Sequence, residues 1–234
     1  MIRHVSNLFL ITISAASICA APKMKVTDDT FVFGKTTQGA VVTHSFWIKS
    51  IGTDTLRIVE VEPGCGCTQA PLLDSTLAPG DSTRLEITLN TRNFRGFVDK
   101  RPSFVTNAGP DRNFLKLYAE MITDSTPVGP IRPTPLIVDV SQFDKPRRKA
   151  KFTIENKSPN ECSLTLVDAS FKSFDVSLPK SVKAGASVEG VVTVRENAVT
   201  SNFRESLTFE LGDEERTRFT LPVVRMYRPK PPDK

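Results

Sequence analysis

The chain has 234 residues, of which 39% are hydrophobic, and it carries 31 basic and 26 acidic side chains. This length fits one or two domains, and the near balance of charge excludes the one-signed field expected of a nucleic-acid-binding protein. Seventeen prolines, together with only scattered helix-period patterns, favour β structure with many loops.

Residues 1–20 have the pattern of a secretory signal peptide. Arg3 gives a basic start, an apolar run begins at Leu8, and small residues surround Ala20, after which we expect cleavage. The apolar run is shorter than the roughly 20 residues that span a bilayer, and no later segment predicts a transmembrane helix. Lipid anchoring through Cys19 is not expected, because Ile18 precedes it where a small residue is normal.

Residues 24–122 predict a first β module. Side chains alternate between the two faces of a strand, so Phe46 and Ile48 are expected to point into a core. The segment Leu85–Leu89 alternates in the same way, and turn residues such as Pro79-Gly80 separate the runs. The module is therefore expected to consist of short strands joined by tight turns.

Residues 136–227 repeat much of this layout and predict a second, degenerate module. Phe152 and Ile154 occupy the positions that Phe46 and Ile48 hold in the first copy. Residues 123–135 are rich in proline and predict a stiff linker with almost nothing to bury.

The charged, proline-rich residues 228–234 predict a disordered tail. Roughly seven short strands in about 100 residues, with regular turns, are typical of an immunoglobulin-like sandwich. We therefore predict an all-β fold with two tandem immunoglobulin-like β-sandwiches behind an N-terminal signal peptide.

Several motifs of the first module resemble the bacterial family called domain of unknown function 1573. The family itself resembles Hydin-type immunoglobulin-like modules of cilia and centrosome proteins and, more distantly, the chaperone-type sandwiches of pilus assembly. The resemblance implies a bacterial envelope protein with a non-enzymatic scaffold or binding role, and it supplies no established ligand. The motifs are Phe31-Val-Phe-Gly34, Phe46-Trp-Ile48, Leu56-Arg-Ile58, Cys65-Gly-Cys-Thr68, Ala78-Pro-Gly80-Asp-Ser82, Gly96-Phe97 and Thr106-Asn107.

The segment Cys65-Gly66-Cys67 is the sharpest chemical feature. In an extended strand, residues two apart lie about 6.6 Å apart and share a face, at the upper limit for a disulfide. Gly64 and Gly66 would let the backbone bend and bring the sulfurs together. Three interpretations remain open: a structural disulfide or two buried thiols at a strand end, an exchange-prone redox disulfide, or a soft-metal site that binds copper or zinc.

His44 and Trp47 are the other candidate site residues. His44, the sole histidine after the signal segment, could supply a third metal ligand to Cys65 and Cys67. Its parity with Phe46 favours instead a histidine in the core or at its edge. Trp47 points away from the core by parity, so it is either a candidate partner contact or a side chain that a neighbouring loop or the second module covers.

Two further features have simpler interpretations. Cys162 is expected to be an incidental, partly buried thiol, with disulfide-linked dimerisation as a minor alternative. The basic run Lys145–Lys151 could contact anionic lipid or polysaccharide, but a solvated loop is the favoured interpretation.

The sequence contains no glycine-rich phosphate loop, zinc-binding histidine pair or nucleophile elbow. We therefore expect no catalytic residues and no cofactor. The predicted function is that of an exported protein of the bacterial periplasm or cell surface. It would bind another envelope protein or a cell-surface polymer, not nucleic acid. The alternative is a thiol-based metal-binding or redox protein that uses Cys65 and Cys67.

Overall fold

The computed structural model describes residues 20–143, 145–169 and 172–229. Within these ranges the chain forms strands β1 to β20 and one short 3-10 helix, η1 (Glu196–Ala198), with no α-helix. The predicted all-β class is therefore confirmed. No helix within these ranges is long and apolar enough to cross a bilayer. The predicted signal peptide up to Cys19, and residues 230–234 of the predicted tail, lie outside the described ranges.

The first repeat, residues 24–122, contributes strands to three sheets. One four-stranded sheet has the order β1-β3-β7-β5, a second has the order β10-β9-β4-β6, and β2, β11 and β8 belong to an eight-stranded sheet. The strands are β1 (Met24–Val26), β2 (Thr30–Thr37), β3 (Val41–Ser50), β4 (Leu56–Glu62), β5 (Thr68–Gln69), β6 (Thr76–Leu77), β7 (Ser82–Asn90), β8 (Gly96–Lys100), β9 (Ser103–Thr106), β10 (Asn113–Phe114) and β11 (Lys116–Ile122).

The second repeat, residues 131–227, contributes strands to two sheets. Strands β12-β14-β18-β16 form a four-stranded sheet, whereas β17, β15, β19 and β20 continue the eight-stranded sheet, with β13 paired to β20. The strands are β12 (Ile131–Thr134), β13 (Val138–Asp139), β14 (Lys149–Asn156), β15 (Cys162–Ala169), β16 (Phe174–Ser177), β17 (Ser181–Val182), β18 (Ser187–Val194), β19 (Phe203–Leu211) and β20 (Arg218–Arg225).

The two repeats share one pairing scheme. The order β1-β3-β7-β5 corresponds to β12-β14-β18-β16, and the parallel pair β2–β11 corresponds to the parallel pair β13–β20. Phe46 on β3 and Phe152 on β14, which the sequence aligned, therefore lie on equivalent strands. The Cys65–Cys67 segment joins β4 to β5, so its counterpart is the connection between β15 and β16.

Each repeat buries its own hydrophobic core, and the predicted inward residues are confirmed. Leu85, Ile87 and Leu89 of β7 are 1% exposed or less, as are Phe152 and Ile154 of β14. Burying a side chain of this kind contributes about 1.5–3 kcal/mol to the free energy of unfolding. The period-two alternation of the sequence thus directs these strands to their cores.

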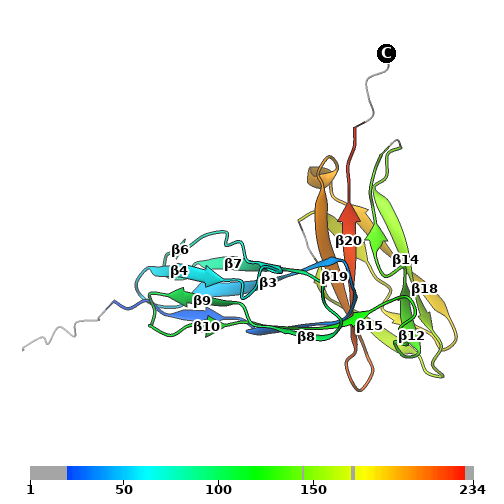
Figure 1. Cartoon of the computed structure of the whole chain (residues 1–234), viewed down its shortest axis with the longest axis horizontal. Coiled ribbons are helices and arrows are strands. Elements are labelled where there is room, and N and C mark those ends of the chain that lie inside the picture. The colour runs from blue at the N-terminus through cyan, green and yellow to red at the C-terminus, as the bar shows by residue number, and fades with distance from the viewer. Residues whose placement is uncertain (1–19, 144, 170–171, 230–234) are drawn as a thin grey trace, which may run out of the picture.

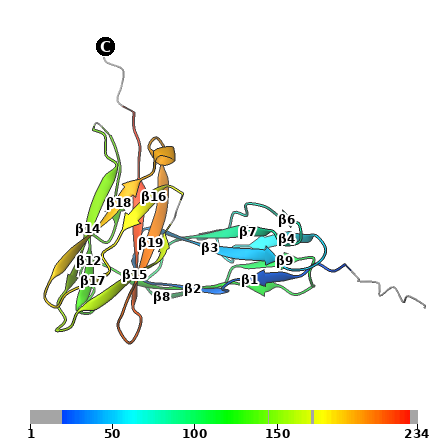
Figure 2. The ribbon, with the colours of Figure 1, turned by 180° about the vertical axis from the view of Figure 1, so that it is seen from behind.

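The repeats are joined by a direct strand pairing. β2 lies parallel to β20, with Lys35 opposite Phe219 and Thr36 opposite Thr220. Gly34 permits this close approach, since a Cβ there would lie 2.2 Å from the carbonyl oxygen of Arg218. Gly34 also has a φ of +69°, a conformation that glycine adopts at little cost. The first repeat meets the side of the second, which gives the molecule an L-like shape (Figures 1 and 2).

Buried hydroxyl groups reinforce this junction. The Oγ1 atom of Thr36 donates to the carbonyl oxygen of Thr220 at 2.9 Å, and the Oγ1 atom of Thr220 donates to the carbonyl oxygen of Phe33 at 2.6 Å. The backbone N–H of Thr43 donates to the Oγ atom of Ser206 at 3.0 Å. Because these hydroxyl groups are buried and paired across the junction, separating the repeats would exchange these hydrogen bonds for hydrogen bonds to water, at a net cost of about 0.5–1.5 kcal/mol each.

The prediction that residues 123–135 form a linker is wrong for the second half of this range. Ile131–Thr134 form β12, the edge strand beside β14, and the Val128 and Ile131 side chains are buried in the second core. Proline is tolerated here because an edge strand can leave one row of backbone groups unpaired. The repeats are therefore joined by the β2–β20 pairing and are not spaced apart by this segment.

Candidate functional site

Strand β8 is the terminal strand of the eight-stranded sheet. Among the described residues it pairs only with β11, where Val98 lies opposite Ala119. Its outer row of backbone N–H and C=O groups therefore lacks a strand partner, and such an edge is a template for adding an extended segment from another chain.

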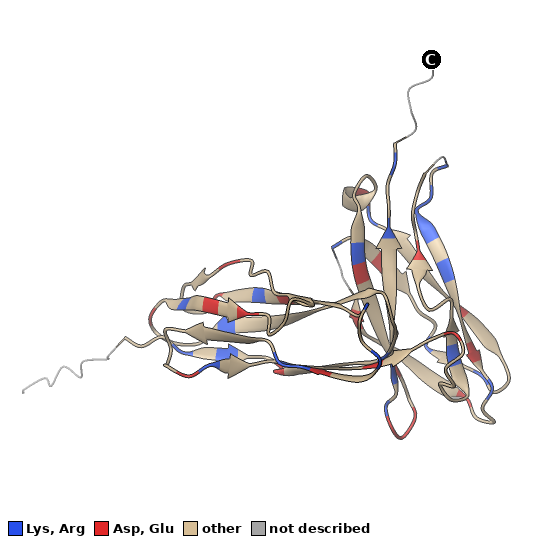
Figure 3. Ribbon diagram, viewed as in Figure 1, with Lys and Arg blue, Asp and Glu red and all other residues tan. Residues whose placement is uncertain are grey.

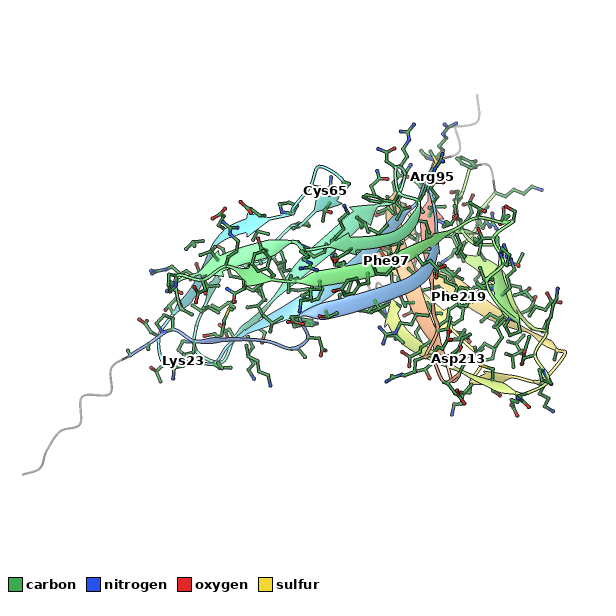
Figure 4. The ribbon with its side chains drawn as sticks, turned by 60° about the horizontal axis from the view of Figure 1, so that its bottom comes forward. Lys23, Cys65, Arg95, Phe97, Asp213 and Phe219 are labelled. Atoms are coloured by element: carbon green, nitrogen blue, oxygen red, sulfur yellow. A yellow bond between two sulfur atoms is a disulfide. The ribbon has the colours of Figure 1, made fainter. Side chains whose placement is uncertain are left out.

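The side chains of β8 alternate between the core and solvent. Val98 is 5% exposed and packs in the first core, whereas Phe97 is 70% exposed. The ring of Phe97 stacks on that of Tyr118 with centroids 5.9 Å apart, and Tyr118 lies opposite Val32 on β2. Figure 4 shows Phe97 at the exposed side of this sheet. The edge is thus accompanied by an exposed apolar row.

A shallow groove lies between the end of β8 and the loop that follows β4. It has a volume of about 340 Å³ and is lined by Pro63, Gly64, Asp99, Lys100 and Arg101. Asp99 accepts a hydrogen bond from Arg101 at 3.0 Å, and this partner raises the pKa of the Arg101 guanidinium. The groove places polar and charged groups next to the unpaired edge.

Positive charge surrounds the start and end of β8. Lys100 lies 4.5 Å from the centroid of the Phe94 ring, a cation–π contact. Arg92 and Arg95 are exposed and have no carboxylate within salt-bridge distance in the part of the chain that the structure describes. An extended segment bound along β8 would therefore meet cations at both of its ends.

Cys65 and Cys67 are joined by a disulfide with their Cα atoms 5.3 Å apart. The backbone bends just before it, where Gly64 has a φ of +83°. The Oγ1 atom of Thr68 lies 3.2 Å from the sulfur of Cys65, and both cysteines are half-buried. The disulfide thus closes the loop that flanks the β8 groove; Cys65 is labelled in Figure 4.

His44 is placed at the junction of the repeats. Its Nδ1 atom lies 2.5 Å from Oδ2 of Asp168 on β15, its ring stacks on Phe31, and it contacts Phe46 edge-on. The described residues contain no group of three or more His, Cys, Asp or Glu side chains that could hold a metal ion. The structure therefore does not bring His44 together with Cys65 and Cys67 as a third ligand.

Trp47 points away from the core, as its parity predicts, and is 51% exposed. It lines a small hollow of about 130 Å³ that also includes Asp168 and Lys172 of the second repeat. Lys172 forms an ion pair with Glu86 beside this hollow. Trp47 is thus an exposed aromatic at the junction, away from the β8 edge.

Cys162 is the free cysteine of the described residues and is buried. It begins β15, and burial raises the pKa of its thiol. Its Sγ atom donates to the carbonyl oxygen of Ser163 at 3.4 Å. In the folded protein this thiol is shielded from a second copy of the chain.

Two hollows of about 640 and 510 Å³ flank the β19–β20 hairpin, and both are lined by Lys35, Glu120 and Glu215. Glu210 lines the smaller one. Burial alone would raise the pKa of Glu210, but hydrogen bonds from Arg218 and Arg216 outweigh burial and hold this pKa below its ordinary value. The hairpin is thus held next to the junction by ion pairs of the largely buried Glu210 carboxylate with Arg216 and Arg218, whose side chains reach solvent.

The sequence reasoning missed Asp168 and Tyr118, and it gave Phe97 no role. Phe97 stood within the Gly96-Phe97 motif, yet alternation could not show that β8 ends a sheet. Asp168 carried no local signal, because its partner His44 lies in the other repeat.

The fold defines a class of protein: an all-β chain of two repeats that share one sheet across their junction. The model of the family described as "Protein of unknown function (DUF1573)" matches residues 24–121. No curated protein matches the sequence.

Solved structures with similar shapes are known. A protein of unknown function from Porphyromonas gingivalis W83 has 13% identity and a TM-score of 0.35, over 86% of this chain and 98% of that one. The YadV chaperone has 11% identity and a TM-score of 0.33, and the Pseudomonas aeruginosa CupB2 chaperone has 10% and 0.30, each over 85% of this chain and 98% of its own.

Proposed function

We propose that the protein is an exported, non-enzymatic component of the bacterial envelope that binds another envelope protein through the unpaired edge of β8. In this proposal the two repeats act as tandem immunoglobulin-like sandwiches that hold the edge in a fixed position. The observation that carries it is β8 itself, a terminal strand of residues 96–100 that includes the 70% exposed Phe97.

The proposal is supported by the chemistry around this edge. A bound strand would gain backbone hydrogen bonds along β8, each contributing about 0.5–1.5 kcal/mol to the free energy of binding. Its side chains on the outer face would pack on Phe97 and Tyr118, and aromatic contacts of this kind dominate many interfaces. Backbone pairing supplies affinity, and the aromatic pair supplies selectivity.

The contacts of His44, the one histidine among the described residues, support the non-enzymatic part of the proposal. A serine or cysteine nucleophile would need a hydrogen bond to the ring of His44. Among the described residues, no serine or cysteine side chain forms a hydrogen bond to this ring. Its Nδ1 atom pairs with Asp168, a partner that a catalytic histidine also can have, and two phenylalanines contact the ring. This arrangement suits a contact between repeats.

The alternative thiol-based function depends on the redox state of Cys65 and Cys67. A disulfide offers no thiolates to copper or zinc, so metal binding requires the reduced pair. Mass spectrometry of the exported protein, with and without alkylation, distinguishes these states. A free pair that retains metal through purification would favour the alternative.

Site-specific photocrosslinking tests the proposed edge. A photoreactive phenylalanine analogue replaces Phe97 in the bacterium that makes the protein, and a matched variant carries it at Leu73, which is equally accessible at 71% exposure. We expect a discrete adduct with one envelope protein at position 97 and none at position 73. Adducts of the same size at both positions, or at position 73 alone, would contradict binding through β8.

A further inference from the structure

The end of the second repeat that lies away from the junction carries a concentration of basic residues, which we call the basic tip. Its exposed side chains come from the loop before β14, from the first residue of β14 and from the chain after β20, and Figure 3 shows blue segments gathered there. The basic tip consists of Lys145, Arg147, Arg148, Lys149 and Arg228.

Few of these charges are neutralised. Arg148 forms an ion pair with Glu196 at 2.5 Å. The other four cations have no carboxylate within salt-bridge distance in the described ranges. Asp144, which the sequence places in the same loop, lies outside those ranges. The tip therefore presents an excess of positive charge to solvent.

Two exposed apolar side chains lie among these cations. Phe143 is 43% exposed and Met226 is 49% exposed, and the guanidinium of Arg228 lies 5.5 Å from the centroid of the Phe143 ring. Gln142 and Tyr227 form a parallel bridge that holds the two segments side by side. Cationic and apolar groups thus share one surface.

A buried arginine fixes the base of the tip. Arg225 is 1% exposed and donates hydrogen bonds to the carbonyl oxygens of Val140 at 2.6 Å, Arg147 at 2.9 Å and Val199 at 2.5 Å. Val140 and Arg147 belong to the segment between β13 and β14, and Val199 follows η1, so Arg225 ties the loop of the tip to the neighbouring loop before β19. Because Arg225 binds the backbone of Arg147, the exposed side chain of Arg147 is presented from a fixed main chain.

We propose that the basic tip docks on the surface of a membrane that contains anionic phospholipid. Clustered lysine and arginine side chains are attracted to anionic headgroups, and each contributes about fivefold in affinity. Phe143 and Met226 can enter the boundary between headgroups and acyl chains, where exposed apolar residues strengthen interfacial binding. A purely polysaccharide partner offers no such apolar boundary, so the apolar pair favours a bilayer.

The overall shape is compatible with this placement. The first repeat joins the second around Phe219 and Thr220, at the opposite end of β20 from Arg225. Figures 1 and 2 show that the first repeat extends sideways, below the tip as drawn, and leaves it free to meet a flat surface. Docking would hold the β8 edge away from the membrane.

Vesicle flotation tests the proposal on the chain from Ala21 to Lys234, which contains every described strand. We expect this chain to bind vesicles that contain phosphatidylglycerol and not pure phosphatidylcholine vesicles. We also expect binding to weaken as salt screens the charges. Equal binding to the two kinds of vesicle, or binding to neither, would overturn the proposal.

Matched variants assign the binding to the tip. The double variant R147E/K149E should lower the partition coefficient more than about tenfold, since each basic side chain near an anionic surface contributes about fivefold. The control K180E/K183E carries the same charge change near β17, at the other end of the second repeat (Figure 2). Its partition coefficient should fall much less. An equal fall of the partition coefficient in both double variants would show a general effect of charge and would refute binding through the basic tip.

A variant that lacks the apolar side chain of Phe143 distinguishes binding to a bilayer from binding to a soluble polyanion. Phe143→Ser should weaken binding to the anionic vesicles severalfold and leave the circular dichroism spectrum unchanged, because the side chain is half-exposed. If Phe143→Ser binds these vesicles like the unmodified chain, and dextran sulfate displaces the protein completely, the tip binds polyanions and the membrane proposal fails.

Discussion

Replacing Gly34 by alanine should open the junction between the repeats while leaving each core folded. The new Cβ would lie 2.2 Å from the carbonyl oxygen of Arg218 and 2.6 Å from its carbonyl carbon. Both are backbone atoms, so no side-chain rotation can relieve the clash. β2 must move away from β20, which breaks the pairing of Thr36 with Thr220.

The expected cost is about 3–4 kcal/mol. A non-glycine residue in the left-handed conformation costs about 1–2 kcal/mol, and Gly34 has a φ of +69°. The two buried hydrogen bonds between β2 and β20, made by the Thr36 and Thr220 hydroxyls, contribute about 1 kcal/mol each. Urea denaturation measures the total loss, and amide hydrogen exchange shows whether residues 33–36 and 218–220 lose protection first.

Gly39→Ala is the matched control. Gly39 has a φ of +79°, but a Cβ there meets no atom within 4 Å. This variant should therefore lose only the conformational cost of about 1–2 kcal/mol, with no change in exchange at the junction. If Gly34→Ala is no more destabilising than Gly39→Ala, then the close approach to Arg218 does not hold the repeats together.

Three other perturbations test separate parts of the structure. Arg225→Met should lower the free energy of unfolding by about 3 kcal/mol in urea, because buried carbonyl groups lose a charged donor; a loss below about 1 kcal/mol would contradict this role. Glu210 has a depressed pKa, so its contribution should be complete above about pH 5 and lost as the pH falls below the ordinary glutamate range. The stability advantage of the unmodified chain over Glu210→Gln, about 2 kcal/mol at pH 7, should therefore shrink at pH 3, and a constant difference would refute it. Replacing Cys65 and Cys67 by serine should cost only about 1–2 kcal/mol in thermal denaturation, because the disulfide closes a very short loop; global unfolding would show that the first repeat depends on it.

Much of the fold could be predicted from local patterns. Alternating burial identified Phe46 and Ile48 on β3 and Leu85 to Leu89 on β7, because a half-buried strand must place every second side chain in the core. Gly64 and Gly66 suggested a bend that could bring the sulfurs of Cys65 and Cys67 together, and the structure joins these residues by a disulfide just after Gly64, which has a φ of +83°.

The proline-rich stretch shows where local reasoning failed. Composition suggested that residues 123–135 bury almost nothing, yet Val128 and Ile131 pack in the second core. Proline excludes a central strand but not an edge strand, and the sequence does not show whether β14 needs an edge partner. The same uncertainty applied to His44, whose partner Asp168 is distant in the chain.

The sequence by itself determined which side chains would be buried, how often the layout repeats, and where sulfur and positive charge would be found. Only the tertiary structure decided that β8 ends a sheet, that β2 crosses to β20, and that Phe143 shares a surface with Arg228. Side-chain alternation is a local property of a strand. Strand order depends instead on hydrogen bonds between backbone groups, which are alike in nearly all residues and pair across long stretches of chain.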